Sequence, residues 1–88
     1  MRGDFFREMK KMRVEVRIFA DLRNYVPGSE NPLFVRLPEG STVHDLLAML
    51  GVPAEKVKVI FVNSRQKSPD FLLSEGDRVG IFPPTGGG

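Results

Sequence analysis

One segment of this 88-residue sequence carries the pattern of an amphipathic helix, and strand-like segments lie on both sides of it. Its apolar side chains recur at spacings of three and four, which places them on one stripe of a helix: Val43, Leu46, Leu47 and Leu50. Thr42 and Asp45 have the spacing of a capping box, and Gly51 is typical of a helix end. A chain with one helix among several strands is expected to pack that helix on a single sheet, an α+β fold.

Four segments are predicted to form strands. Residues 13–19 and 33–37 alternate apolar and polar side chains, as strands with one buried face do. Residues 57–63 are β-branched and nearly all apolar, which predicts a central strand covered at least partly on both faces. Residues 78–82 form the last strand. We expect the first and last strands to lie side by side in the middle of the sheet.

Two longer connections are expected to be tied to the core by apolar residues. Residues 20–31 contain Pro-Gly and Asn-Pro steps, which favour a turn, and Leu22 and Tyr25 are the predicted anchors. Residues 64–77 are polar except for the island Phe71-Leu72-Leu73, which should pin this loop.

The positive charge is concentrated at the start of the chain. The net charge is +2, to which residues 1–13 contribute +3 and residues 14–88 contribute −1. A nucleic-acid-binding domain should carry its basic residues on the folded face, so nucleic acid is not an expected partner. We predict an N-terminal extension over residues 1–12 and one domain over residues 13–88, with a flexible tail at 83–88.

Several kinds of site lack the residues they need. The sequence has no cysteine, which excludes disulfides and thiolate metal sites, and its single histidine is His44. A metal site or general base would need convergent partners, so we interpret His44 as a surface residue. No segment approaches the roughly 20 apolar residues that span a membrane, and no signal peptide is evident. We expect a cytoplasmic protein that binds no metal and no membrane.

The chain ends in Phe82-Pro83-Pro84-Thr85-Gly86-Gly87-Gly88. The prolines should stop the last strand near Phe82, and glycines without a Cβ fit a slot too narrow for other residues. If Gly88 carries a free carboxylate, the six residues after Phe82 could hold it roughly 20 Å away, inside another protein's active site. The alternative is an ordinary frayed terminus.

The element order and the tail together resemble the ubiquitin-like β-grasp sulfur carriers, a family that includes the molybdopterin synthase small subunit and the thiamine sulfur carrier. The resemblance covers residues 13–88 and implies a mixed sheet of four or five strands packed on one main helix. The matching segments are Phe19-Ala20-Asp21-Leu22-Arg23, Glu39-Gly40-Ser41-Thr42-Val43 followed by Leu46-Leu47, Leu73-Ser74-Glu75-Gly76-Asp77-Arg78-Val79, and Phe82-Pro83-Pro84 with Gly87-Gly88. The last of these is closest to the molybdopterin synthase small subunit.

The resemblance implies a reaction at the end of the main chain. In the family, an E1-like adenylyltransferase uses ATP to adenylate the terminal carboxylate, and sulfur then replaces the adenylate to give a thiocarboxylate. The implied reactive residue is Gly88, with Gly87 beside it, and the residues that would fit the tail into its partners are Pro83, Pro84, Thr85 and Gly86. The implied partners are the adenylyltransferase, a sulfur-donating enzyme and the large subunit of molybdopterin synthase. The chain itself would bind no cofactor and would act as a sulfur donor more than as a catalyst.

Three phenylalanines are candidates for contact with these partners. Phe82 lies opposite the inward residues of its strand, and Phe19 ends the first strand; the resemblance places both near the face that partners cover. Phe34 also points away from the inward set of its strand. Exposed aromatics beside a functional tail are typical binding hot spots. The alternative is that these rings fill a second small core under the loop at residues 71–73.

The residues leave other functions open. The same activated carboxylate could acylate lysine amines, as ubiquitin does, or carry sulfur for thiamine or tRNA thiolation. The chain could instead be a non-covalent β-grasp binding module.

Three features depart from the family pattern: Gly86 stands where a larger residue is usual, the segment Ser64-Arg65-Gln66-Lys67 is unusually polar, and the residues before Met12 have no counterpart.

Overall fold

A computed structural model describes residues 10–28 and 30–84 of the chain. Most of the predicted N-terminal extension lies outside the described residues, and so do the tail residues Thr85, Gly86, Gly87 and Gly88.

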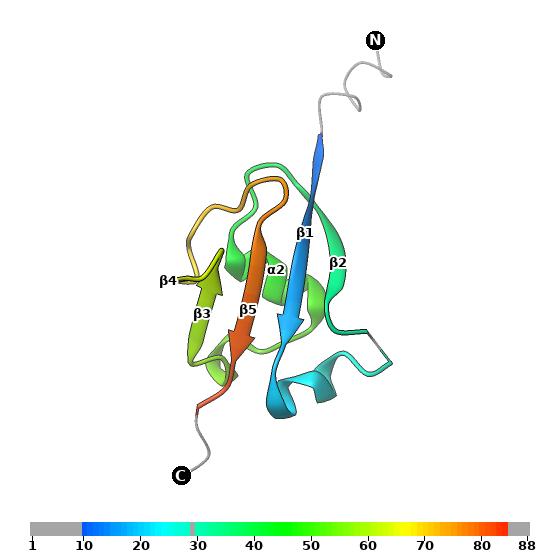
Figure 1. The fold of residues 1–88 in the computed structure, drawn as a ribbon, viewed down its shortest axis with the longest axis vertical. Helices are drawn as coiled ribbons and strands as arrows, with labels where there is room; N and C mark the ends of the chain where they lie inside the picture. Colours follow the sequence, from blue (N-terminus) through cyan, green and yellow to red (C-terminus); the bar gives the residue numbers. More distant parts are fainter. Residues whose placement is uncertain (1–9, 29, 85–88) are drawn as a thin grey trace.

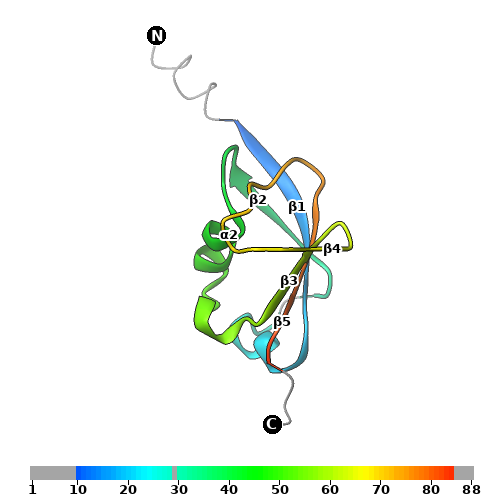
Figure 2. The same cartoon turned by 90° about the vertical axis from the view of Figure 1, so that its left-hand side faces the viewer.

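The described residues form one mixed sheet with an α-helix on one of its faces (Figures 1 and 2). The elements are β1 (Lys11–Ile18), the 3₁₀ helix η1 (Ala20–Tyr25), β2 (Leu33–Pro38), α2 (Val43–Leu50), the 3₁₀ helix η2 (Ala54–Lys56), β3 (Val59–Val62), β4 (Arg65–Lys67) and β5 (Arg78–Phe82). The strand order is β2-β1-β5-β3-β4, with β1 and β5 parallel and the other neighbours antiparallel. The predicted α+β class and the central pairing of the first and last strands are confirmed.

The core lies between the sheet and α2. Alternate residues of four strands point toward the helix and are at most 8% exposed: Val14, Val16, Ile18, Val35, Leu37, Ile60, Val62, Val79 and Ile81. They meet the predicted stripe of α2, of which Val43, Leu46 and Leu47 are buried and Leu50 is partly buried. Apolar alternation in the sequence therefore identified the face of the sheet that the helix covers.

Local hydrogen bonds fix both ends of α2 where the sequence predicts them. The Thr42 hydroxyl accepts the Asp45 N–H at 3.2 Å, and the Asp45 carboxylate accepts the Thr42 N–H at 2.9 Å, which completes the capping box. These bonds, chiefly the one from the Thr42 backbone, hold the pKa of Asp45 below its ordinary value. Gly51 ends the helix at φ 79°, and His44 is exposed as expected.

The predicted strand at residues 57–63 is present and is covered at least partly on both faces, but it is not the central strand of the sheet. The strand β3 is shorter and lies between β5 and β4, while β5 and β1 are central. Only Ile60 and Val62 are buried beneath α2; Val59 and Phe61 are partly exposed on the opposite face. This segment carries apolar side chains on both faces because the ring of Phe82 packs against Phe61 on the opposite face.

Two other boundaries differ from the predictions. The strand β1 begins at Lys11, two residues before the predicted start, because Lys11 and Met12 pair with Pro38 and Leu37. Met12 is only 3% exposed and belongs to the core. In the first connection Leu22 is buried, but Tyr25 is 40% exposed and is not an anchor.

The second connection is pinned to the core as predicted, through two of its three apolar residues. Leu73 is buried and Phe71 packs partly against the core, whereas Leu72 is 60% exposed. The turn into β5 is held by Asp77, whose carboxylate accepts the Ser74 N–H and the Asn63 side-chain amide, both at 2.8 Å. This carboxylate ties the start of β5 to the end of β3.

Candidate functional site

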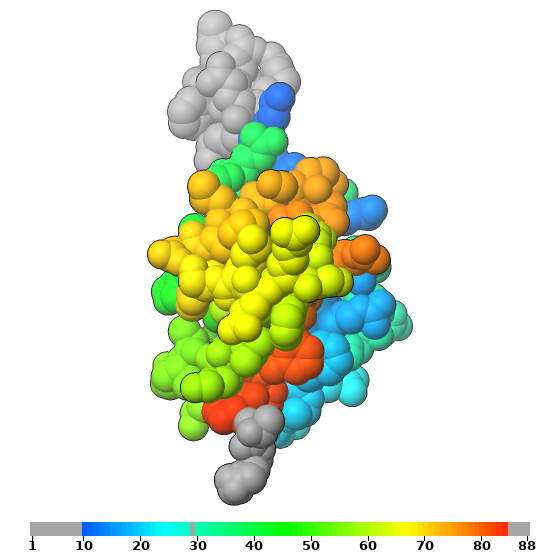
Figure 3. Space-filling model, turned by 60° about the vertical axis from the view of Figure 1, so that its left-hand side comes forward, coloured from blue at the N-terminus to red at the C-terminus, as the bar shows by residue number. Residues whose placement is uncertain are grey.

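The face of the sheet opposite α2 presents the outward side chains of β1, β5 and β3. In Figure 2, α2 lies on one side of the sheet and this outward face lies on the other. Figure 3 shows β5, in red, reaching the surface between β3 and β1. The strand that leads into the tail is therefore central in the sheet and still accessible from this side.

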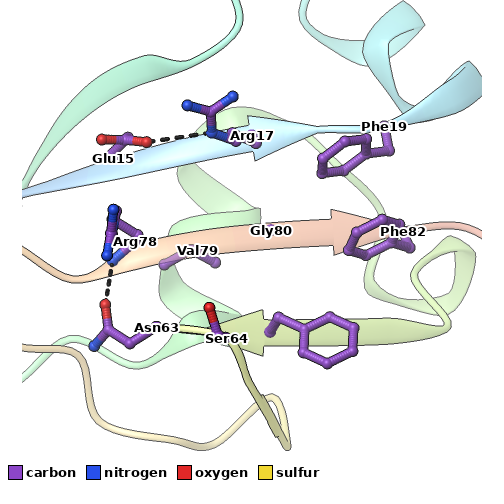
Figure 4. Close-up of a pocket in the computed structure, with 10 residues that line it drawn as sticks. Glu15, Arg17, Phe19, Asn63, Ser64, Arg78, Val79, Gly80 and Phe82 are labelled. Atoms are coloured by element: carbon purple, nitrogen blue, oxygen red, sulfur yellow. Dashed lines mark hydrogen bonds and ion pairs between the residues drawn. The ribbon is translucent and has the colours of Figure 1, made fainter.

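Three phenylalanines gather on the outward face near the end of β5, and we refer to Phe19, Phe61 and Phe82 as the aromatic cluster. The Phe19 and Phe82 rings stack with centroids 4.2 Å apart and planes 4° from parallel (Figure 4). The Phe61 ring meets Phe82 edge-on, with centroids 5.7 Å apart. All three side chains are half-buried, so the rings keep one apolar side open to solvent.

Strand register brings the cluster together. Ile18 pairs with Ile81 in the parallel β1–β5 ladder, so the next residues along each strand, Phe19 and Phe82, fall side by side. Phe61 pairs with Gly80 in the antiparallel β3–β5 ladder, two positions before Phe82 on the same face. The aromatic cluster thus depends on the pairing of three strands that are not consecutive in the sequence.

Two shallow hollows flank the cluster. One, of about 340 Å³, extends from the rings over Gly80 to the polar side chains of Glu15, Arg17, Asn63 and Arg78 (Figure 4). The other, of about 700 Å³, is lined by the rings together with Lys58, Val59, Gln66, Pro83 and Pro84. The second hollow follows the path of the chain as it leaves β5.

The polar side of the first hollow carries a surplus of positive charge. The Glu15 carboxylate accepts from Arg17 Nε at 3.3 Å and so pairs with one of the two arginines. The backbone N–H of Arg78 donates to Asn63 Oδ1 at 3.0 Å, and its guanidinium has no ion pair within residues 10–28 and 30–84.

The structure brings together four of the residues singled out in the sequence. Phe19 and Phe82 stack, and Pro83, partly buried, and Pro84, exposed, line the adjoining hollow. Phe34 lies apart from the cluster on β2, 58% exposed, with the Arg13 guanidinium 5.3 Å from its ring centroid. The alternative of a second core under residues 71–73 is wrong for these rings, because they lie on the outward face of the sheet.

Sequence reasoning missed Phe61 as a member of the site. The sequence placed it in a strand covered at least partly on both faces and gave it no role in binding. Its position in the strand could have identified it. Phe61 lies between Ile60 and Val62, which are buried beneath α2, so its side chain points to the opposite face. Its partner across the ladder could be known only from the register.

Aromatic side chains, and not candidate metal ligands, gather at this part of the described structure. No group of three or more histidine or acidic side chains in the described part of the chain could hold a metal ion. None of the described helices is long and apolar enough to cross a membrane. What the arrangement offers is a half-open aromatic surface directly beside the two prolines that begin the tail.

Comparisons with known proteins agree on one family. A model of the ThiS family matches residues 16–88. The sequence matches no curated protein. Among solved structures, a chain described as molybdopterin converting factor subunit 1 from Pyrococcus furiosus is 31% identical with a TM-score of 0.67, over 84% of this chain and 99% of that chain.

Two further structures extend this similarity. Small archaeal modifier protein 1 from Methanosarcina acetivorans is 25% identical with a TM-score of 0.62, over 90% of this chain and 99% of that chain. A chain in the complex of subunits 1 and 2 of molybdopterin-converting factor from Helicobacter pylori is 25% identical with a TM-score of 0.54, over 88% of this chain and 100% of that chain.

Proposed function

This chain belongs to the ThiS family of ubiquitin-like sulfur carriers, and from that premise we propose that it is the small, sulfur-donating subunit of a molybdopterin synthase. The family and the ubiquitin-like β-grasp fold are as predicted. Support for the specific pathway comes from the similarity to molybdopterin converting factor subunit 1 and to a chain of the two-subunit complex.

The proposed chemistry takes place at Gly88. In an E1-like adenylyltransferase, its carboxylate would attack the α-phosphate of ATP, releasing pyrophosphate and forming an acyl-adenylate. Adenylation removes the negative charge that repels nucleophiles and supplies AMP as a leaving group. Hydrosulfide supplied by a sulfur-donating enzyme would then attack the acyl carbon, break its bond to AMP and leave a thiocarboxylate, with the release of AMP and a proton. Because activation consumes ATP, we expect the reaction to occur in the cytoplasm.

The observation that carries the proposal is the aromatic cluster beside the start of the tail. A partner that covers Phe19 and Phe82 would also hold Pro83 and Pro84, whose fixed φ angles stiffen the exit from β5. Only the four residues 85–88 would remain to reach the partner's active site, roughly 13 Å at ~3.3 Å per residue. Docking would thereby turn sulfur transfer into a nearly unimolecular step.

A reconstituted synthase assay tests the proposal. The sulfur-loaded chain is mixed with the large subunit of molybdopterin synthase and its cyclic pterin precursor, and molybdopterin is quantified. We expect product with the intact chain and none with a variant that lacks Gly87 and Gly88. Product from the truncated variant, or none from the loaded intact chain, would contradict the assignment. A carrier for thiamine or tRNA thiolation would load with sulfur and still fail in this assay.

A second function is favoured by the similarity to small archaeal modifier protein 1. A lysine amine could attack the same acyl-adenylate or a thioester formed from it, so that Gly88 becomes joined to another protein. Incubating the tagged chain with ATP and a lysate of its source organism, followed by immunoblotting, would reveal conjugates as a ladder of larger species. A non-covalent binding module would give neither conjugates nor a thiocarboxylate.

A further inference from the structure

Gly80 occupies the middle of the central strand β5, on the outward face of the sheet. It lies between Arg17 of β1 and Phe61 of β3 in the two ladders. A strand interior is an unfavourable place for glycine, because glycine loses the most conformational freedom on folding and offers no side chain for packing. The position therefore calls for a physical reason.

Neither the backbone nor the packing of the fold requires glycine here. Gly80 is not among the described residues with positive φ, so an L-residue can adopt its conformation. A Cβ at this position would lie 3.4 Å from Cε1 of Phe82 and 3.5 Å from Cε2 of Phe19, which are ordinary van der Waals distances. Alanine would fit, and the ladders on both sides of Gly80 are continuous, so the position is not a bulge. Glycine in a strand can also mark a place where another molecule approaches closely.

The missing side chain leaves the floor of the first hollow open. The rings of Phe19 and Phe82 stand on one side of Gly80, and Arg17 and Arg78 stand on the other (Figure 4). We propose that this hollow receives one protruding apolar side chain of the large subunit, with a carboxylate of the same partner beside it that pairs with Arg78. The proposal rests on the proposed function and assigns Gly80 as the residue that determines how closely the partner can approach.

The charges around the hollow favour an acidic residue of the partner beside the apolar one. Glu15 already neutralises Arg17, whereas the Arg78 guanidinium has no ion pair within the described residues. An apolar side chain alone would bury the rings but would leave this cation unmatched. Charge pairs at the rim of an interface act mainly on the association rate and its dependence on salt.

Calorimetric titration of the large subunit into matched variants tests the proposal. Gly80→Ala should bind at least about tenfold more weakly than wild type, because its methyl group occupies the floor of the hollow. Its melting temperature should be unchanged or higher, because alanine is better than glycine in a strand. Arg78→Gln should raise the Kd and reduce its dependence on salt concentration. Arg36→Gln, on the same face but outside the hollow, is the control and should bind as wild type does.

The outcomes separate this inference from the function on which it rests. Wild-type affinity in Gly80→Ala, together with weakened binding in Phe82→Ala, would overturn the hollow as a docking point and leave the proposed function standing. A fall in the melting temperature of Gly80→Ala would show that the glycine serves packing, which also overturns the inference. Failure of the wild-type chain to bind the large subunit would overturn both.

Discussion

Replacing Phe82 with alanine perturbs the aromatic cluster without touching the main core. The ring stacks on Phe19 at 4.2 Å and meets Phe61 at 5.7 Å, and each such pair contributes about 0.5–1.5 kcal/mol beyond its buried area. Loss of both pairs should lower the free energy of unfolding by about 1–3 kcal/mol. The cost should be smaller than the roughly 3–5 kcal/mol of a fully buried phenylalanine, since the ring is half-buried. The domain should remain folded.

The effect of Phe82→Ala on partner binding should exceed what the loss of stability can explain. An aromatic hot spot costs about 2 kcal/mol or more when truncated, which raises the Kd for the large subunit roughly 30-fold. Calorimetry well below the melting temperature, on variants whose folding is verified by circular dichroism, measures this change. Met49→Ala, at a side chain that is 57% exposed on α2, is the control and should bind normally. An unchanged Kd for Phe82→Ala would show that this ring is not part of the interface.

Four further variants test the tail, the helix cap and the last turn. Deleting Gly87 and Gly88 should leave the melting temperature unchanged and abolish sulfur loading; normal loading by mass spectrometry would contradict this. Thr42→Ala should lower the free energy of unfolding by about 1 kcal/mol in a urea titration, because it removes the capping hydroxyl. The pKa of Asp45 is lowered in the folded chain, so ionised Asp45 contributes fully to the free energy of unfolding above the ordinary aspartate pKa. This contribution is lost as the pH falls through the lowered value, and Asp45→Asn should therefore make the free energy of unfolding less dependent on acid pH. Asp77→Ala should cost roughly 1–3 kcal/mol by thermal unfolding, since two donors lose their acceptor.

Features set by neighbouring residues were predictable from the sequence. The capping box of α2, its apolar stripe and Gly51 at its end depend on contacts within about one turn of helix, and the structure reproduces all three. The last strand was also predicted with its observed bounds, Arg78–Phe82, because a turn and two prolines delimit it. The expected pairing of the first and last strands is observed as the ladder between β1 and β5.

Features set by pairing between distant strands were not predictable in the same way. The apolar run around β3 indicated at least partial cover on both faces, but only the structure shows that Phe82, across the ladder, supplies the cover over Phe61. The edge strand β4 has the sequence Arg-Gln-Lys and no apolar alternation, so only its ladder with β3 identifies it. Tyr25 resembled a core residue by type, but the 3₁₀ helix η1 turns its side chain outward.

The candidate site shows the same division. Phe19 and Phe82 were singled out because Phe19 ends the first predicted strand, Phe82 lies opposite the inward residues of the last strand, and the family resemblance placed both near the face that partners cover. Their mutual stacking, the third ring and the hollow at Gly80 follow from the register of three strands. The sequence therefore singled out two of the three rings, while the shape of the surface they form required the structure.

The central claim is that sulfur is carried on the main-chain carboxylate of Gly88. Its most direct test is the mass of the C-terminal peptide after the chain is incubated with the E1-like adenylyltransferase, ATP and a sulfur donor. Our account predicts a gain of about 16 Da, the replacement of one oxygen by sulfur, confined to the peptide that ends in Gly88 and absent without ATP. An unchanged peptide mass under conditions that load an authentic sulfur carrier, or sulfur attached at any other position, would contradict it.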